Sequence, residues 1–231
     1  YNVNSDSDLM TYFNSSEQRL QQVLTFYNEE RRLSIVQRDF PNVKWSGAVD
    51  IHEHIGNEPL EYDSHNSTAF GVAADGTFFA TANHHVDPLR MAVSSRPYDI
   101  HSFRQLPDNS INPKDDDRVT YPSFSYLGDE RFFSYREQEA GGGKPAFRWL
   151  LKRWNASSRY WEDAAQLNTG THLRLYVAMW PGILTAPNCI CRLSGVTIDR
   201  RCCPGARHNN MICFICTAVM VCTGSSMTSQ K

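Results

Sequence analysis

The chain contains no cysteine before Cys189, although it has seven cysteines among its 231 residues. This absence excludes a disulfide framework or a cysteine-ligated zinc site from the larger part of the protein. All seven lie between Cys189 and Cys222, and only Cys213 and Cys216 have a separation typical of zinc ligand pairs. An odd number also leaves one thiol over in any disulfide scheme. We therefore expect residues 188–231 to form an irregular, Cys-rich tail, with a structural zinc site or a disulfide knot as the alternative.

Long apolar runs, strong net charge and an initiating methionine are also missing. No run of about 18 or more apolar residues occurs, so the sequence predicts no membrane-spanning helix. The formal net charge of −2 is not typical of a nucleic-acid-binding protein. The chain begins at Tyr1 without a signal-like apolar segment, which predicts a fragment or a processed chain whose targeting cannot be read from this end.

What the sequence does contain is a repeated pattern of strand, turn and second strand. The pattern occurs at residues 23–39, 68–82, 123–135 and 147–161, and the first three turns are centred near residues 30, 75 and 128. Asp75-Gly76 between alternating apolar runs is a strong local signal for a β-hairpin. Phe26 and Ile35 favour strands over a helix in the first of these segments. Residues 8–22 show no clean period, and we expect a loop or a short helix there.

The spacing of these turns indicates how the hairpins are assembled. The three turn centres lie 45 and 53 residues apart, which is close to the period of four-stranded blades in a β-propeller. The sequence therefore predicts an all-β fold, a β-propeller of four-stranded antiparallel blades, with a β-sandwich as the alternative. Residues 1–187 supply roughly four blades by this period, so we expect a partial propeller domain with an incomplete ring.

Two histidines stand at the outer ends of the hairpin that turns at Asp75-Gly76. His65 precedes its first strand and His85 follows its second strand. The turn should bring both residues to one rim of the sheet. Converging imidazoles are suited to proton transfer, anion binding or metal ligation. The alternative is that both are ordinary exposed loop histidines.

Tyr121 and Arg136 bracket the hairpin at residues 123–135 in the same way. We expect the two hairpins to belong to adjacent blades, so that the two histidines, the tyrosine and the arginine meet at one site. The alternative is that Tyr121 packs in the core and Arg136 forms an ion pair with Glu137 or Glu139.

A set of His, Tyr and Arg side chains suits β-elimination from a uronic-acid polysaccharide. A fixed Arg or His neutralises the uronate carboxylate and stabilises the charge that develops when the adjacent proton is removed. Tyr or neutral His can take that proton, and another such group can protonate the leaving oxygen. Glycoside hydrolysis would instead need two carboxylates that flank the bond. Asp63, Asp87 and Glu137 lie in the rim segments but form no matched pair in the sequence.

The segments that carry these residues resemble the BNR-repeat-containing family that includes the ulvan lyases. The similarity covers about residues 22–161, and its most specific pieces are His65-Asn66, the run from His85 to Leu89, Thr120-Tyr121-Pro122 and Tyr135-Arg136. The resemblance implies a sialidase-like propeller that cleaves an acidic, possibly sulfated polysaccharide by β-elimination, and a secreted or extracytoplasmic location.

The resemblance also implies roles for individual residues. His65 and His85 match the active-site histidines of the family, Tyr121 its catalytic tyrosine and Arg136 its carboxylate neutraliser, whereas His84 has no clear counterpart. We expect three further residues to contact the substrate, namely Asn66, Asn83 and Tyr135. We expect no metal and no other cofactor, and neither nucleic acid nor a membrane as a partner.

Two other functions stay open. A non-catalytic carbohydrate-binding propeller fits a chain with too few blades for a ring. A sialidase-like hydrolase would need an arginine triad and Ser-x-Asp-x-Gly turns, of which Ala73-Ala74-Asp75-Gly76 is only a weak echo. Glycosylation sequons begin at Asn14, Asn66 and Asn155, and a glycan on Asn66 would obstruct the predicted site.

Overall fold

The structure is a computed structural model that describes residues 7–56, 63, 65–107, 110–111, 118–138 and 147–166. It consists of β-strands and a single turn of 3-10 helix, η1, at His52–His54. The strands are β1 Ser7–Asn14, β2 Arg19–Tyr27, β3 Leu33–Asp39, β4 Val49–Asp50, β5 Ala69–Val72, β6 Phe78–Thr81, β7 His85–Asp87, β8 Met91–Ser94, β9 Phe103–Gln105, β10 Val119–Leu127, β11 Glu130–Gln138, β12 Phe147–Asn155 and β13 Tyr160–Gln166. The predicted all-β class is confirmed. The boundary at residue 187 and the predicted tail at 188–231 lie outside the described residues.

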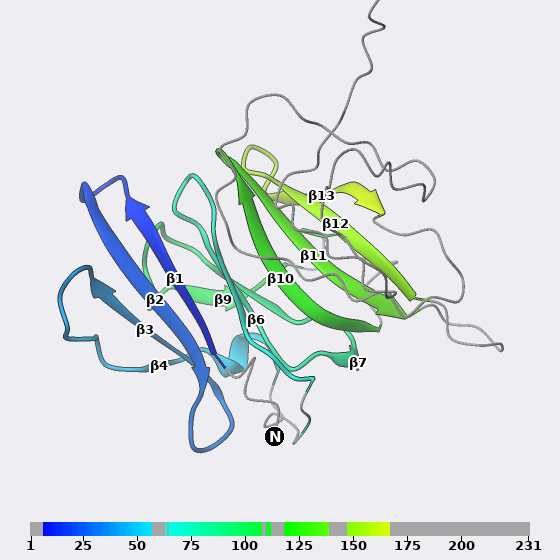
Figure 1. Ribbon diagram of the computed structural model, residues 1–231, viewed down its shortest axis with the longest axis horizontal. Coiled ribbons are helices and arrows are strands. Elements are labelled where there is room, and N and C mark those ends of the chain that lie inside the picture. The colour runs from blue at the N-terminus through cyan, green and yellow to red at the C-terminus, as the bar shows by residue number, and fades with distance from the viewer. Residues whose placement is uncertain are drawn as a thin grey trace, which may run out of the picture.

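The strands form three antiparallel sheets (Figure 1). Their strand orders are β1-β2-β3-β4, β5-β6-β8-β9 and β13-β12-β11-β10-β7. The third sheet therefore has five strands, which corrects the expectation of four strands in every sheet. Its extra edge strand, β7, comes from the connection between β6 and β8. Within the described residues the sheets do not close into a ring.

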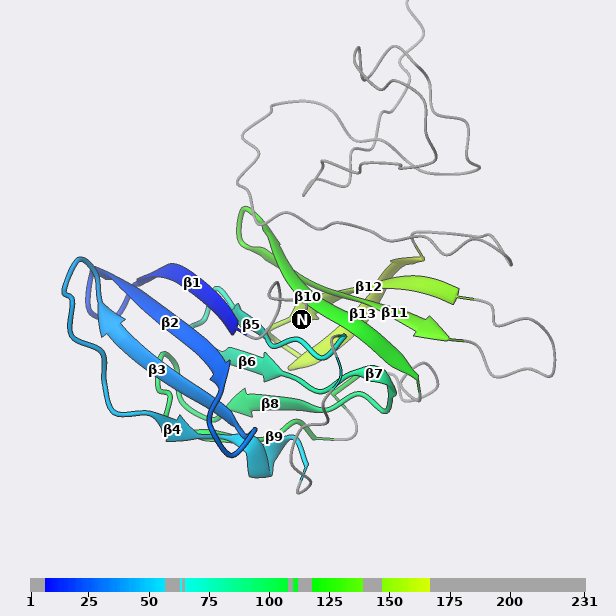
Figure 2. The ribbon, with the colours of Figure 1, turned by 60° about the horizontal axis from the view of Figure 1, so that its bottom comes forward.

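The β5–β9 sheet lies between the other two sheets (Figure 2). One of its faces packs with Val23 and Ile35 of the first sheet, and the other packs with Phe133 and Trp161 of the third. Consecutive residues of β6 point to opposite faces, so that Phe78 enters the first cluster and the next residue enters the second. Burial on both faces explains why β5, β6 and β8 are short continuous apolar runs in the sequence.

The four predicted hairpins are present, but the expectation of a loop or short helix at residues 8–22 is wrong. This segment forms β1 and the start of β2, which pair from Ser7↔Phe26 to Asn14↔Arg19. The Asn14 side chain accepts hydrogen bonds from the backbone N–H groups of Ser16 and Glu17 at 3.0 and 3.2 Å, which builds the turn. Strand pairing and this Asx turn decide the conformation, and neither is visible as a period in the sequence.

No helix among the described residues has the length and apolarity needed to cross a membrane.

Candidate functional site

Pairing across the third sheet brings together residues that lie far apart in the sequence. Thr120 of β10 pairs with His85 of β7 on one side and with Arg136 of β11 on the other. Directly paired residues of an antiparallel sheet point to the same face. A hydrogen bond of 3.0 Å from the backbone N–H of Val86 to Thr120 Oγ1 fastens β7 to this sheet. His85, which follows the β5–β6 hairpin in the sequence, is therefore placed beside the strands that bear the tyrosine and the arginine.

Tyr121 lies at an irregularity in β10. The β10–β11 register shifts between Thr120 and Ser123, and Tyr121 has a φ of 56°. A bulge of this kind re-aims a side chain out of the regular alternation of a strand. Val86 on the neighbouring β7 also has a positive φ, at 66°, which is a strained conformation for a β-branched residue. The sheet is thus locally distorted on both of the strands that meet at the site.

The four predicted catalytic side chains lie in one cluster. The His65 and His85 rings stack with centroids 4.0 Å apart and planes 19° apart. The Tyr121 ring lies 5.9 Å from the His65 ring, and the Arg136 guanidinium lies 4.8 Å above the Tyr121 ring. The guanidinium also lies 4.6 Å from the Phe147 ring, and the Arg136 residue is only 6% exposed. The predicted convergence on one face is confirmed, whereas the chemical roles of the four residues stay predictions.

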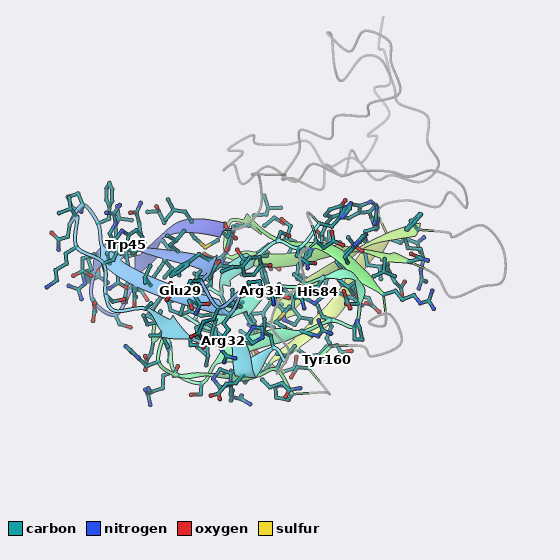
Figure 3. All side chains as sticks on the ribbon, turned by 90° about the horizontal axis from the view of Figure 1, so that it is seen from below. Glu29, Arg31, Arg32, Trp45, His84 and Tyr160 are labelled. Atoms are coloured by element: carbon teal, nitrogen blue, oxygen red, sulfur yellow. The ribbon has the colours of Figure 1, made fainter. Side chains whose placement is uncertain are left out.

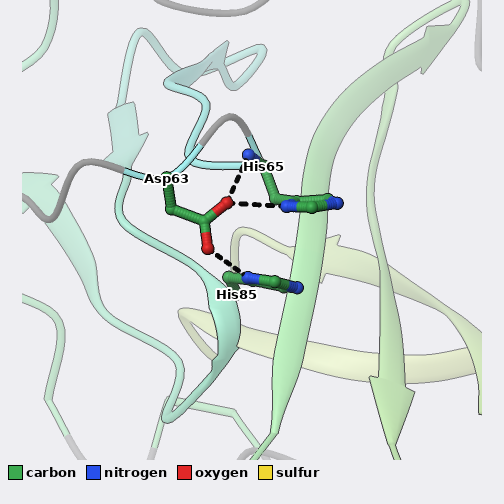
Figure 4. A group of neighbouring side chains, drawn as sticks. All are labelled: Asp63, His65 and His85. Atoms are coloured by element: carbon green, nitrogen blue, oxygen red, sulfur yellow. Dashed lines mark hydrogen bonds and ion pairs between the residues drawn. The ribbon is translucent and has the colours of Figure 1, made fainter. Parts of the chain in front are cut away.

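Asp63 joins the two histidines, a role that the sequence reasoning missed (Figure 4). Its Oδ1 accepts a hydrogen bond from His65 Nδ1 at 2.6 Å, and its Oδ2 bonds His85 Nδ1. Oδ1 also accepts the backbone N–H of His65 at 2.8 Å, which forms an Asx turn. The signal for this contact is an aspartate two residues before a histidine. It is local and could have been read from the sequence, but the second bond to His85 depends on the fold.

These bonds change the acidity of Asp63. Burial would raise the pKa of its carboxyl, but the bonds from the His65 backbone and from the two rings outweigh burial and lower the pKa to about 2. Asp63 is therefore a carboxylate at neutral pH. An imidazole that donates through Nδ1 to a carboxylate keeps, when neutral, a lone pair on Nε2. Neither Nε2 atom is bonded to another residue that the structure describes.

His84, the residue before His85, lies in a different environment. Its side chain is fully buried, and its Nε2 accepts the backbone N–H of Arg90 at 2.8 Å. Burial, and to a lesser degree the nearby positive charge of Arg90, lowers the pKa of His84 to about 3. His84 is thus a neutral structural residue whose lone pair is used within the fold.

The three predicted substrate-contacting residues are all buried. Tyr135 has no exposed surface and packs in the core against Phe133, with ring centroids 5.4 Å apart. Tyr135 therefore does not line the site, which corrects the expectation that it touches substrate. Asn66 and Asn83 are 3% and 8% exposed, and the Asn66 amide donates to Asn83 Oδ1 at 2.8 Å. Because the amide nitrogen of Asn66 is buried inside the fold, a glycan at this sequon would have to displace the side chain from this position.

The cluster offers proton acceptors, a phenol and a guanidinium within one site. Asp63, His65 and His85 also offer three metal-ligand atoms within 4.8 Å of one another. However, imidazole lone pairs lie in the ring plane, so two rings stacked with nearly parallel planes do not direct them at one ion between the rings. The geometry fits a hydrogen-bonded acid–base cluster better than a metal centre.

A separate hollow of about 530 Å³ lies beside Trp45, well away from His84 in Figure 3. Its lining includes Gln37, Arg38 and Trp45, and the Arg38 guanidinium lies 4.4 Å above the Trp45 ring. The lining of this hollow contains no group of proton-transfer side chains comparable to the histidine cluster. We therefore identify the histidine cluster as the candidate functional site.

Comparison with known families agrees with this organisation. The chain matches the family model described as BNR repeat-containing family member over residues 21–220. The protein therefore belongs to the BNR repeat-containing family. Comparison with curated proteins finds no match.

Solved structures similar to the chain include polysaccharide lyases of the ulvan lyase type. The polysaccharide lyase Uly1 has a TM-score of 0.55 and 15% identity, covering 73% of this chain and 43% of that chain. A PL25 ulvan lyase has a TM-score of 0.49, 15% identity and coverages of 75% and 42%. The same type bound to -[GlcA(1-4)Rha3S]- has a TM-score of 0.48, 16% identity and coverages of 67% and 36%. The chain thus spans less than half the length of these structures, and at this identity the likeness to Uly1 shows the fold alone.

Proposed function

We propose that this protein is a polysaccharide lyase that cleaves an acidic, uronate-containing polysaccharide by β-elimination. The observation that carries the proposal is the contact between two stacked histidines, Tyr121 and Arg136. These side chains supply the three capacities that the reaction needs, which are a proton acceptor, a proton donor and a positive charge for a carboxylate. The fold likeness to the polysaccharide lyase Uly1 supports the same reaction class.

The proposed reaction assigns one capacity to each group. An open Nε2 of the histidine pair takes the proton from the sugar carbon next to the carboxylate. The electron pair of that C–H bond forms a carbon–carbon double bond, and the bond from the next carbon to the glycosidic oxygen breaks. The Tyr121 phenol, which ordinarily keeps its proton at neutral pH, protonates the leaving oxygen. Arg136 neutralises the carboxylate as charge develops on it.

The carboxylates near the cluster support elimination over hydrolysis. A glycoside hydrolase needs one carboxylic acid and one carboxylate that are both available to the bond. Asp63 is committed to two imidazoles, and the Glu137 carboxylate bonds Arg148 at 2.9 Å in a buried position. Asp87 accepts the backbone N–H of His85 at 3.0 Å. All three carboxylates are therefore engaged within the protein.

The proposal extends to architecture and location. We propose that the three sheets are blades of an incomplete β-propeller, an arrangement that the turn spacing in the sequence also predicts. A sulfated, ulvan-like polymer is the substrate that the family resemblance favours. A polymer of this kind is outside the cell, so the proposed function goes with a secreted or extracytoplasmic protein.

The test is incubation of the protein with ulvan, with other polyuronates and with a neutral glucan as the control. Elimination creates an unsaturated uronate, which is followed by its ultraviolet absorbance, while new reducing ends are counted in parallel. We expect both signals to rise together on a uronate polymer and neither to rise on the glucan. New reducing ends without a rise in ultraviolet absorbance would show that the protein is a hydrolase and not a lyase. Binding without either signal would identify a non-catalytic carbohydrate-binding protein.

A further inference from the structure

The two stacked histidines share a single carboxylate. In Figure 4 the rings extend side by side from Asp63, and each ring presents its Nδ1 to a different oxygen of that residue. The side chains of His65 and His85 are 39% and 34% exposed, and that of Asp63 is 25% exposed. The carboxylate lies at the Nδ1 ends of both rings, and the Nε2 ends of the rings point away from it.

We propose that Asp63 is the positioning residue of this site, holding both histidines in the Nδ1–H tautomer. A carboxylate can only accept, so each neutral ring must place its proton on Nδ1 to make the observed bond. Both Nε2 atoms then face the same side of the pair as proton acceptors. The catalytic consequence rests on the proposed function, whereas the tautomers exist without any substrate.

The site is not symmetric, and the asymmetry predicts what an asparagine would do. Oδ1 of Asp63 accepts two donors, His65 Nδ1 and the backbone N–H of His65 at 2.8 Å. A backbone N–H can only donate, so the oxygen of an asparagine must occupy the Oδ1 position. The asparagine NH₂ group then takes the Oδ2 position and donates to His85 Nδ1. His85 is forced into the Nε2–H tautomer, while His65 keeps its proton on Nδ1.

A metal centre is the competing interpretation of the same three residues. Bound through Nδ1, a metal ion would displace the Nδ1 protons and leave Nε2–H on both rings. The two interpretations therefore predict opposite tautomers for the native protein, and one measurement separates them.

The experiment is NMR of the imidazole nitrogens in protein labelled with ¹⁵N-histidine, recorded as pH is raised until the shifts stop changing. The variants are Asp63→Asn and, as a matched control, Asp87→Asn. Asp87 accepts the backbone N–H of His85 at 3.0 Å, and its carboxylate contacts neither of the two rings. The control thus removes the same charge near His85 without touching an imidazole.

We expect the Nδ1–H pattern for His65 and His85 in the native protein and in Asp87→Asn. In Asp63→Asn only His85 should switch to Nε2–H, and Asp63→Glu should restore the native pattern at least in part. An Nε2–H pattern for both rings in the native protein, or a native pattern for His85 in Asp63→Asn, would overturn the proposal. Added Zn²⁺ that shifts Nδ1 of both rings at a stoichiometric amount would overturn it in favour of a metal site.

Kinetics give the second readout. General acid–base catalysis typically contributes about 10²–10⁴ in rate, so Asp63→Asn should lower kcat by about 10² or more while KM changes little. An unchanged kcat together with a switched His85 would contradict a catalytic use of the shared carboxylate. If the native protein shows the expected tautomers but eliminates no uronate polymer, the proposed function fails and the structural role of Asp63 stands.

Discussion

The β5–β6 and β10–β11 hairpins each have a turn end and an opposite, open end, and the backbone conformation differs between the two ends. At the turn end, Asp75 accepts the backbone N–H of Thr77 at 3.0 Å, and the strands beyond it pair in regular register from Val72↔Phe78 to Ala69↔Thr81. At the opposite end, Asn83, Val86 and Tyr121 have φ values of 63°, 66° and 56°. Only the second end contains the candidate site. Positive φ values also occur in turns, for example at Tyr98 beside Gly76, but among the described residues only Val86 and Tyr121 have such non-glycine values within a strand.

This difference shows which interactions position the functional side chains. Local turn residues build the hairpins, but strand pairing between separate hairpins and the distortion of β7 and β10 put the functional side chains in contact. The consecutive residues His84 and His85 show the same contrast on a smaller scale. Nε2 of His84 accepts a backbone bond inside the fold, whereas Nε2 of His85 is bonded to no residue that the structure describes. Substitutions at the site end should therefore change activity, and substitutions at the turn end should change stability.

The largest expected effect comes from Arg136. Its guanidinium lies between the rings of Tyr121 and Phe147, and a lysine would keep the charge but lose the planar fork that binds a carboxylate in two places. We expect Arg136→Lys to lower the elimination rate by about 10²–10³ and Arg136→Ala to lower it further. The assay is the rate on a uronate polymer, with folding checked by circular dichroism.

Arg153→Lys is the matched control for this arginine. Arg153 is on the same sheet, but its side chain is exposed and pairs with Glu162 at 2.9 Å. A rate for Arg153→Lys as low as that for Arg136→Lys would show that the loss is a general effect of changing this sheet.

His84 should make the stability of the fold depend on pH. Its pKa is about 3 in the folded protein and 6.5 for an ordinary histidine, so the unfolded chain binds one more proton between these values. The free energy of unfolding should therefore fall as pH drops below 6.5, by at most about 1.4 kcal/mol per pH unit from this residue. Urea unfolding at several pH values measures it.

The comparison for His84 uses two variants. His84→Gln removes the titrating group and should flatten the dependence between pH 6.5 and 4, although the protein is less stable overall. The same change at His101, whose side chain is exposed, should leave the slope as it is. A slope that is equally steep in His84→Gln would assign the dependence to other groups.

Two glycines in hairpin turns should affect stability without any effect on the elimination rate. Gly76 has a φ of +82°, and a Cβ there would lie 2.6 Å from the Tyr98 ring; Gly128 has a φ of +57° with nothing within 4 Å. Gly128→Ala should lower the free energy of unfolding by about 1–2 kcal/mol from backbone strain alone. Gly76→Ala should lower it by roughly 1–3 kcal/mol more because of overpacking. Both variants should eliminate at the native rate once folded, and equal losses would show that the Tyr98 contact is unimportant.

The fold was predictable where local chemistry determines it. Asp75-Gly76, Gly128-Asp129 and the strand-forming residues around Phe26 marked hairpins that the structure contains. β1 was not predictable in this way, because its outward residues Leu9 and Phe13 remain 56% and 53% exposed and its periodicity is weak. Its conformation follows from pairing with β2, which a local pattern does not contain.

The sequence predicted which residues form the site, but not the strand pairing and hydrogen bonds that connect them. His65, His85, Tyr121 and Arg136 could be brought together because each lies at the end of a hairpin. The transfer of β7 to another sheet could not be foreseen, since it depends on pairing between residues 85 and 120. The same tertiary contact lets one carboxylate serve two histidines, so Asp63 looked like an isolated acidic residue.

A comparison of Tyr121→Phe with Tyr126→Phe tests whether the distorted part of β10 carries the chemistry. Both remove one hydroxyl from β10, but Tyr126 lies in the regular part of the strand, where its hydroxyl accepts the backbone N–H of Val72 at 3.2 Å. The elimination rate on a uronate polymer and the free energy of unfolding are measured for each. We expect Tyr121→Phe to lose about 10² or more in rate with native stability, and Tyr126→Phe to lose about 1 kcal/mol of stability with native rate. A folded Tyr121→Phe that eliminates at the native rate would contradict the claim that the distorted end of the sheets carries the chemistry.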